Sequence, residues 1–435
     1  MPSPARALAF AILQEVESRG PTLDERLAQP DAEALDPRER AFLHELVLGS
    51  LRRRGSLDHA LAGLSARPLD RLSPDVRAAL RLGAHQLLHL RVKPHAAVSE
   101  SVELARAARP RAAGFVNAIL RRLAREGPPP LPDPVAEPRR WLTSAGSLPE
   151  WLADRWLAHL GPVASVARAR ALLEEPPTFL RLNPRVSDAA ARAEADGLAL
   201  RPGAVPGALE ATAGRVAALA RAGVLYPQDQ GSQLVARLAA VPGVLLDACA
   251  APGGKSTLLG DLVQGPVIAA EASLPRLRTL GALVRRWGAE NVHVLGADAL
   301  RPPLRERFDA VLLDAPCSGL GTVARHPDLR WRLRPKDISR LAARQSALLA
   351  SLASLVRPGG LLVYAVCSVE PEENEGVTGP FLAEHPDFAA EPLPEWAAPF
   401  AEGDHVRMRP EAHRGDCFFA ARWRRTGDAA PDPRL

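Results

Sequence analysis

The stretch Gly243-Val-Leu-Leu-Asp-Ala-Cys-Ala-Ala-Pro-Gly-Gly-Lys-Ser-Thr257 decides the fold class. It joins a short apolar run to a loop that contains Gly253 and Gly254, an order typical of a buried strand that turns into a helix. The two glycines let backbone amides at the helix N-terminus approach a ligand closely. A phosphate-binding loop of the form G-x-x-x-x-G-K-[ST] needs glycine where Cys249 stands, and the pattern G-x-G-x-x-G is absent here. The loop therefore predicts a nucleoside-type cofactor that carries no polyphosphate.

Apolar runs and helical patterns alternate along the chain from about residue 225. The predicted strands are residues 243–249, 266–272, 291–297, 308–315 and 359–367, and helical stretches such as 340–355 separate them. This alternation is typical of a doubly wound α/β sheet, so we expect a Rossmann-like domain over residues 225–425. Two later runs, 405–409 and 417–423, are expected to add antiparallel strands at its edge.

The part of the chain ahead of this domain is expected to begin with an all-α domain. Residues 1–126 show helical periodicity, with helix starts at Pro37 and Pro74 and further helices over about 97–108 and 112–125. The remaining expected divisions are a proline-rich linker over 127–147, a mixed extension of the Rossmann-like domain over 148–224, and a tail over 426–435. The extension is expected to contain a helix over 148–160 and an extended segment over 178–183.

Composition and charge indicate which partners, compartment and kinds of site to expect. The 435 residues carry a net charge of +5, and residues 1–126, with 20 basic and 15 acidic side chains, hold the whole excess. A basic bias of this size fits a nucleic-acid partner and an ordinary solvated surface equally well. No apolar run approaches 18 residues and the N-terminus lacks a signal layout, so we expect a cytoplasmic protein without a membrane partner. The four cysteines form no C-x-x-C pair, so we expect neither a metal site nor disulfides.

Two acidic residues lie at the ends of the second and third predicted strands. Glu271 ends the second strand, and Asp298 follows the third. Ligands of doubly wound sheets bind beyond the carboxyl ends of the strands, where a carboxylate can accept both ribose hydroxyls of a nucleoside. We therefore expect Glu271 to hold a ribose and Asp298 an adenine amino group, although either acid alone could simply cap the next helix. Together with the glycine loop, the two acids favour S-adenosylmethionine as the cofactor.

Three of the four cysteines follow predicted strands. Cys249 follows the first strand, Cys317 the fourth and Cys367 the fifth. These strands are neighbours in doubly wound order, so the three thiols are expected to face one crevice. A single cysteine in such a place is more often a small buried apolar side chain, but three at one edge favour a functional role.

The residue types around the later two cysteines match the needs of methylation at cytosine C5. C5 is a poor nucleophile, and a thiolate that adds at C6 makes C5 able to attack a methyl group. The reaction then needs an acid near N3 and N4, loss of the C5 proton, and a second group that assists release of the thiol. Asp314, Cys317 and Cys367 supply these types. Geometry alone allows either cysteine to attack.

These motifs resemble the Nol1/Nop2/Sun family of RNA 5-methylcytosine methyltransferases over residues 148–425. Most of the resemblance lies in the segments 247–255, 314–319, 365–368 and 371–374. It implies that Cys367 is the nucleophile and that Cys317 aids product release, whereas the related enzymes that act on DNA attack with the cysteine equivalent to Cys317. It also implies that Lys255 and Asp314 face the target base. The cofactor-contacting positions that it implies are Cys249, Ala250, Ala251, Pro252, Gly253, Gly254, Lys255, Glu271, Asp298 and Asp314.

The N-terminal helices resemble the NusB-like RNA-binding domain, on residues 97–105 and 114–122. The combination is similar to bacterial 16S ribosomal RNA methyltransferases of the RsmB type, which implies 16S rRNA as the partner; we expect a monomer. Val366 stands where the family usually has Thr, and Glu271 where Asp is common, but neither change removes a reacting group. The alternatives are another RNA, either tRNA or large-subunit rRNA, and a non-catalytic RNA-binding assembly protein.

Overall fold

The computed structural model describes residues 2–17, 20–305 and 307–426, and it divides into two compact units. The first, here called the helical unit, comprises the chain up to Glu175 together with Val323–Arg334. The second, here called the sheet unit, comprises Pro176–Thr322 and the chain from Pro335 onward. The predicted tail lies outside the described residues except for Thr426. None of the helices in the described ranges is long and apolar enough to cross a membrane.

The helical unit is all-α, as predicted. Its longer helices are α1 (Pro4–Glu17), α4 (Pro37–Arg52), α5 (Arg54–Ala62), α6 (Pro74–His89), α7 (Pro94–Ala108), α8 (Ala113–Glu126) and α10 (Glu150–Ala171). The short ones are α2 (Leu23–Leu27), α3 (Pro30–Glu33), α9 (Pro138–Thr143) and α16 (Leu329–Arg332). Helix α4 begins as expected, because the Asp36 side chain accepts bonds from the amides of Arg38 and Glu39. Gly127, at φ 73°, ends α8.

Two segments belong to the helical unit although the sequence pattern did not place them there. Residues 148–175, expected in the extension of the Rossmann-like domain, form α10 and are grouped with the helical unit. Segment 323–334 is also grouped there, although it follows a strand of the large sheet in the sequence. Trp331 donates from Nε1 to the carbonyl of Leu51 at 2.9 Å, and its ring lies 4.5 Å from the Arg54 guanidinium. These polar contacts, added to apolar packing, hold the segment on the helical unit.

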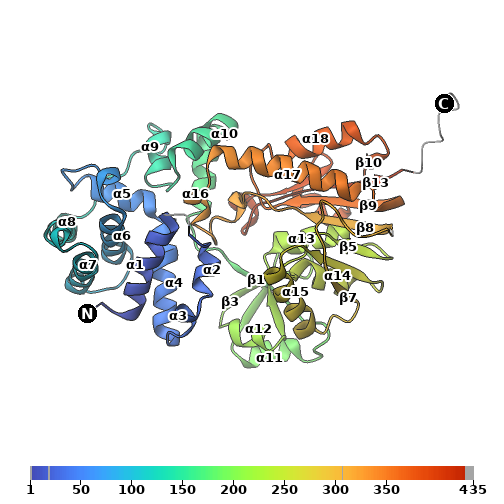
Figure 1. The fold of residues 1–435 in the computed structure, drawn as a ribbon, viewed down its shortest axis with the longest axis horizontal. Helices are drawn as coiled ribbons and strands as arrows, with labels where there is room; N and C mark the ends of the chain where they lie inside the picture. The colour runs from blue at the N-terminus through green and yellow to red at the C-terminus, as the bar shows by residue number, and fades with distance from the viewer. Residues whose placement is uncertain (1, 18–19, 306, 427–435) are drawn as a thin grey trace. The chain divides into compact units, whose positions relative to one another are not determined.

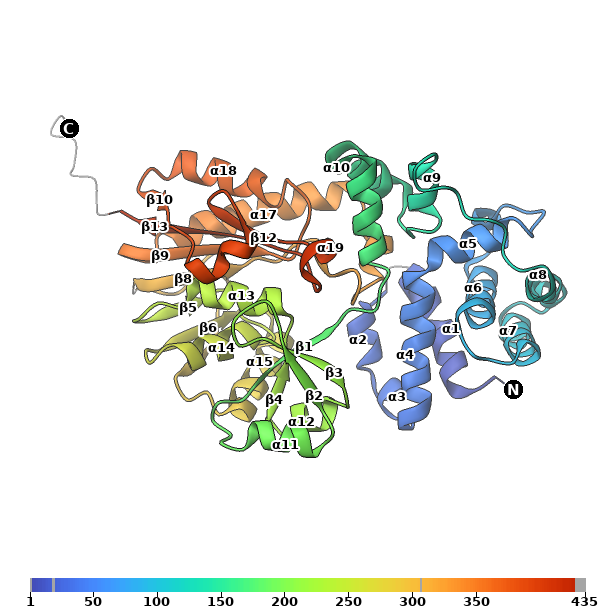
Figure 2. The same ribbon diagram turned by 180° about the vertical axis from the view of Figure 1, so that it is seen from behind.

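The smaller sheet of the sheet unit is antiparallel and has the strand order β2-β3-β1-β4. Its strands are β1 (Thr178–Leu182), β2 (Ala199–Pro202), β3 (Leu209–Ala213) and β4 (Leu225–Pro227). Helices α11 (Ala189–Ala195) and α12 (Ala217–Arg221) pack on it, with Leu180, Leu219 and Leu225 in the shared core (Figure 2). Strand β1 matches the predicted extended segment.

The larger sheet has the order β11-β12-β13-β9-β8-β5-β6-β7, with β10 paired to β13. Its parallel strands are β5 (Leu245–Asp247), β6 (Val267–Glu271), β7 (Val292–Gly296), β8 (Phe308–Asp314) and β9 (Val356–Val366). The antiparallel edge contains β10 (Phe388–Ala390), β11 (Ala401–Glu402), β12 (His405–Met408) and β13 (Phe418–Arg425). The predicted Rossmann-like sheet and its antiparallel edge are therefore confirmed.

Helices cover both faces of this sheet, so its central strands are apolar on both sides. Leu312 packs on the face covered by α13 (Gln230–Ala239), α14 (Gly254–Leu262) and α15 (Leu274–Trp287). Its neighbours Val311 and Leu313 pack on the opposite face, under α17 (Pro335–Ala353) and α18 (Glu375–Glu384). Figure 1 shows these two helix layers on either side of the sheet. This arrangement leaves the carboxyl edge of the parallel strands for a ligand.

Candidate active site

The two later cysteines meet at the carboxyl edge of the large sheet. Cys317 follows β8 and Cys367 directly follows β9, and these parallel strands pair with each other. The two Sγ atoms lie 3.3 Å apart, and both cysteines are half-buried. Cys249 follows β5, the next strand in the sheet, but the described residues show no hydrogen bond between it and either thiol. The structure thus forms a pair of thiols, with the third cysteine placed nearby in the glycine loop.

Two of the three cysteines, Cys317 and Cys249, are held as thiols. The hydrogen bond with Cys367, burial, and charge on Cys367 and Glu373 together raise the pKa of Cys317 well above its usual value. Burial raises the pKa of the Cys249 thiol to about 12, with smaller contributions from nearby carboxylates. A protonated Cys317 therefore lies beside Cys367, and it is suited to proton transfer rather than to the first attack.

A lysine–carboxylate pair lies at the same edge. Lys255, in the first turn of α14, places Nζ 2.7 Å from Oδ2 of Asp314, the last residue of β8. Burial opposes charge on Lys255, but the charge of Asp314 and its hydrogen bond outweigh burial, and the lysine pKa is raised. Nζ also lies 5.3 Å from the ring of Phe418 in β13. The family resemblance implied that both residues face the target base, but it did not indicate the pair or the aromatic ring, and Phe418 belongs to a strand far along the chain.

The glycine loop has the shape that its sequence predicts. Gly253 adopts φ 109° at the N-terminus of α14, a conformation that disfavours other residues. A Cβ at Gly253 would lie 2.8 Å from Leu280 Cδ1, so the Leu280 side chain would have to shift to admit a larger residue. Asp247, at the end of β5, is fully buried, and burial raises its pKa to about 6 although Ser256 Oγ donates to its Oδ2 at 2.7 Å. Backbone amides are thus presented next to a buried carboxyl group.

Glu271, at the end of β6, and Asp298, which follows β7, offer carboxylate oxygens at the carboxyl edge of the large sheet. Glu271 is 5% exposed; its Oε1 accepts the Ser273 amide at 2.9 Å, while its Oε2 makes no hydrogen bond to any described residue and lies 3.5 Å from Arg276 Nη1. Asp298 is exposed and accepts the Leu300 amide through Oδ1 at 3.0 Å. A buried acceptor without a donor costs free energy, and ribose hydroxyls can supply the donors. These residues therefore fit the nucleoside part of S-adenosylmethionine.

Arg181 of β1 connects the small sheet to α14, and sequence reasoning missed it. Its guanidinium donates to Thr257 Oγ1 and Asp261 Oδ2 at 2.6 Å each, and to the Gly254 carbonyl at 3.3 Å. It also stacks 4.1 Å from the Trp287 ring. Burial lowers the pKa of Arg181 to about 10, so it stays charged at neutral pH. The helix turn that carries Lys255 is thereby fixed from outside the Rossmann-like sheet.

Comparisons with known proteins agree with the fold. A family model described as "16S rRNA methyltransferase RsmB/F" matches residues 239–424, and a model of the NusB family matches residues 3–125. The ribosomal RNA small subunit methyltransferase B of Thermus thermophilus is 40% identical over 98% of both chains. A probable enzyme of the same name from Bacillus subtilis is 33% identical over 90% of this chain and 92% of its own.

A solved structure resembles part of this chain. A methyltransferase homologue protein from Pyrococcus horikoshii is 27% identical, with a TM-score of 0.56 over 68% of this chain and all of the other. Identity of 40% over nearly the whole of two chains shows common family membership. The chain belongs to the 16S rRNA methyltransferase RsmB/F family and carries a NusB-family domain at its N-terminal side.

Proposed function

We propose that this chain transfers a methyl group from S-adenosylmethionine to C5 of a cytosine in 16S ribosomal RNA, through a covalent bond between Cys367 and C6. The observation that carries the proposal is the pair of thiols 3.3 Å apart beside the Lys255–Asp314 pair. Family membership supports RNA as the methyl acceptor, since the relatives are named for small-subunit ribosomal RNA. A methyltransferase acting on an exposed amino group would need neither thiol.

In this proposal, different residues at the carboxyl edge of the sheet act in different steps of the reaction. The Cys367 sulfur adds to C6, which shifts electron density to C5, and the bound cofactor supplies the methyl group that C5 attacks. Asp314 and Lys255 are placed to bind the base and to stabilise charge that develops on it. Water takes the C5 proton as the Cys367–C6 bond breaks, and the Cys317 thiol beside Cys367 donates its proton to the departing Cys367 sulfur.

The ribose-binding role of Glu271 is tested by Glu271→Ala. We expect affinity for S-adenosylmethionine to fall by about 1–3 kcal/mol, because ribose hydroxyls would lose a buried acceptor. Isothermal titration calorimetry measures the change, and the exposed Glu384→Ala on α18 serves as the control with unchanged affinity. Equal affinities for Glu271→Ala and the unaltered chain would remove Glu271 from the cofactor site.

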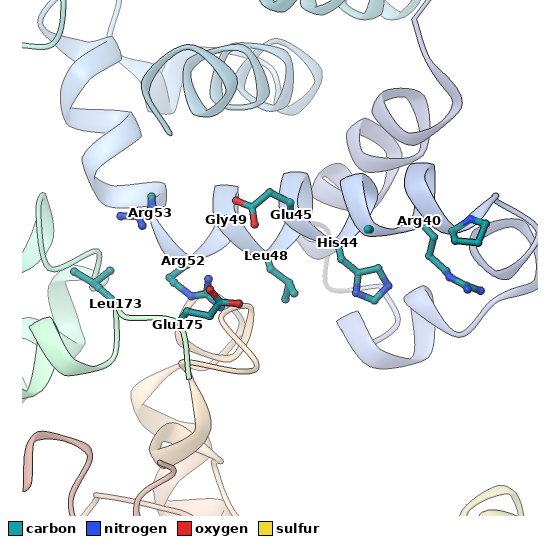
Figure 3. A pocket seen from close by; sticks show the side chains of 11 residues that line it. Arg40, His44, Glu45, Leu48, Gly49, Arg52, Arg53, Leu173 and Glu175 are labelled. Carbon is teal, nitrogen blue, oxygen red and sulfur yellow. The ribbon is translucent and has the colours of Figure 1, made fainter. Parts of the chain in front are cut away.

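A basic hollow of about 580 Å³ in the helical unit supports RNA binding there. Arg40, His44, Arg52 and Arg53 line it from α4 and its end, together with the acidic Glu45 and Glu175 (Figure 3). Burial and the charge of Arg40 lower the pKa of His44, so arginines supply the positive charge at neutral pH. Arg52 donates to the Ala324 carbonyl at 2.8 Å, whereas no described residue forms an ion pair or hydrogen bond with the side chains of Arg40 and Arg53. These two guanidinium groups are thus available for phosphates.

The double variant Arg40→Ala/Arg53→Ala tests this assignment. We expect weaker RNA binding and a salt dependence, log Kd against log salt concentration, that is shallower by about 0.7–0.9 per lost phosphate contact. Fluorescence anisotropy over a salt series measures both quantities. Arg106→Ala is the control, because Arg106 is exposed and already paired with Glu103. An unchanged slope in the double variant would show that the RNA does not use this hollow.

A further inference from the structure

The two cysteines of the site are each followed by a buried serine. Ser318 follows Cys317 and is 3% exposed, and Ser368 follows Cys367 and is 2% exposed. Their hydroxyl oxygens lie 3.1 Å apart, on the inner side of the two loops that carry the thiols. The Cys-Ser repeat is visible in the sequence, but it gives no sign that the two serines meet.

Both serines converge on the carboxylate of Glu373, which is fully buried. Glu373 Oε2 accepts a hydrogen bond from Ser318 Oγ at 2.5 Å and a second from Ser368 Oγ. Its Oε1 accepts the Ser318 amide at 2.8 Å and Gln345 Nε2 at 2.9 Å. Four donors therefore surround one carboxylate, and two of the residues that supply them are adjacent in the chain to the reacting thiols.

The carboxylate itself is held in place by the surrounding helix and strand. Gln345 of α17 donates from Nε2 to the Pro316 carbonyl at 3.0 Å as well as to Glu373. The Tyr364 hydroxyl of β9 lies 2.6 Å from the Glu373 carbonyl and 3.1 Å from Gln345 Oε1. A buried network with its bonds made restricts motion more strongly than exposed polar contacts do. Glu373 is thus a fixed point between the two cysteine loops.

We propose that Glu373 is a positioning residue that sets the distance and orientation between the two thiols by holding Ser318 and Ser368. The inference rests on the proposed function, in which the two cysteines act in successive steps. Ser368 connects the loop that carries Cys367, here called the nucleophile loop, to Glu373 through its hydroxyl group. Ser318 connects the loop that carries Cys317, here called the release loop, to Glu373 through both its hydroxyl and its amide. Geometry errors of about 1 Å in an active site can cost about a hundredfold in rate.

The negative charge of Glu373 also affects the protonation of Cys317. It contributes to the raised pKa of Cys317, after the hydrogen bond with Cys367, burial and the charge of Cys367. A buried negative charge disfavours a second negative charge close by. Glu373 therefore helps to keep the release cysteine protonated while the other cysteine attacks.

The proposal predicts that the two serines affect different steps. In Ser368→Ala the nucleophile loop loses its hydroxyl bond to Glu373, so formation of the bond to C6 should slow by about tenfold or more. In Ser318→Ala the nucleophile loop keeps its hydroxyl bond from Ser368 to Glu373, so the bond to C6 should form at a rate within about threefold of normal. Release should then slow instead, and adduct should accumulate on ordinary RNA. A merely structural role for the serines predicts no such separation.

The experiment separates the steps with two RNA substrates. RNA that contains 5-fluorocytidine reports adduct formation alone, because fluorine at C5 blocks elimination, and ordinary RNA reports turnover and accumulated adduct. Both are followed by denaturing electrophoresis for the full-length chain and for Ser318→Ala, Ser368→Ala and Glu373→Gln. Glu373→Gln, which keeps the side-chain shape but removes the charge, should slow both steps. The control is Ser346→Ala, an exposed serine of α17 that bonds only to the Ala342 carbonyl of its own helix.

The outcomes distinguish this inference from the function on which it rests. We expect affinity for S-adenosylmethionine within about twofold of normal in all four variants, which shows that the sheet unit is folded. If both serine variants slow the same step, or neither slows any step, the positioning role is overturned. If affinity for S-adenosylmethionine falls together with both rates, Glu373 and its serines only stabilise the fold. If the unaltered chain forms no adduct on fluorinated RNA, the covalent function itself fails.

Discussion

Cys367→Ala should abolish methyl transfer and should form no covalent complex with RNA. Without the Cys367 sulfur no bond to C6 can form, and C5 then lacks the electron density needed to attack a methyl group. Cys317 lies 3.3 Å from the missing sulfur, but its burial and the charge of Glu373 still raise its pKa, so Cys317 is not expected to replace Cys367 as the nucleophile. Product formation should fall at least about a thousandfold, a loss of about 4 kcal/mol in transition-state stabilisation.

Cys317→Ala should behave in the opposite way. The bond to C6 and methyl transfer remain possible, but release stalls, so a protein–RNA complex should survive denaturing electrophoresis and reverse slowly. The measurement is a gel of each variant after incubation with RNA and S-adenosylmethionine. A stable complex with Cys367→Ala and none with Cys317→Ala would reverse the two roles and indicate the mechanism used by DNA cytosine methyltransferases.

Arg181→Met should destabilise the sheet unit by about 3 kcal/mol. The change leaves Asp261, whose side chain is 7% exposed, without one of its buried partners. Breaking a buried ion pair costs about 3–5 kcal/mol, and the lower end applies because Arg185 and Trp287 still contact Asp261. For a domain of this size the melting temperature should fall by about 6–12 °C.

Differential scanning calorimetry measures this shift. The control is Arg192→Met, because Arg192 and its partner Asp188 are more than half exposed, and a surface pair contributes at most about 1 kcal/mol. A fall for Arg181→Met no larger than for the control would show that β1 does not support α14. A larger loss of stability in Arg181→Met than in Arg192→Met would matter for function, because Arg181 bonds to α14 and the first turn of α14 carries Lys255.

The parallel sheet and its edge residues could be predicted because each depends on local sequence. Strands such as β8 are continuous apolar runs between helical patterns, and parallel pairing then brings Asp314 and Cys317 to the same edge as Cys367. The glycine loop could be predicted for the same reason, since the φ angle of Gly253 is a property of that position. The resemblance to a known family supplied what local pattern left open, namely which cysteine attacks.

The parts that could not be predicted depend on contacts between distant segments. Strand β2 is mostly exposed, so it lacks the apolar run that marks a strand. Trp331 bonds to Leu51, 280 residues away, and nothing in either segment indicates the partner. Glu373 lies within a recognisable motif, yet its bonds to Ser318 arise only when the loops after β8 and β9 come together. Long-range polar contacts of this kind leave no periodic pattern in the sequence.

The most direct test of the account is to identify the residue that bonds to the target base. The full-length chain is incubated with S-adenosylmethionine and RNA that carries 5-fluorocytidine, and the trapped complex is digested and mapped by mass spectrometry. The account predicts that a methylated, fluorinated cytidine is attached to the peptide that contains Cys367. Attachment to the peptide that contains Cys317, or the absence of any attached nucleotide while ordinary RNA is methylated, would contradict it.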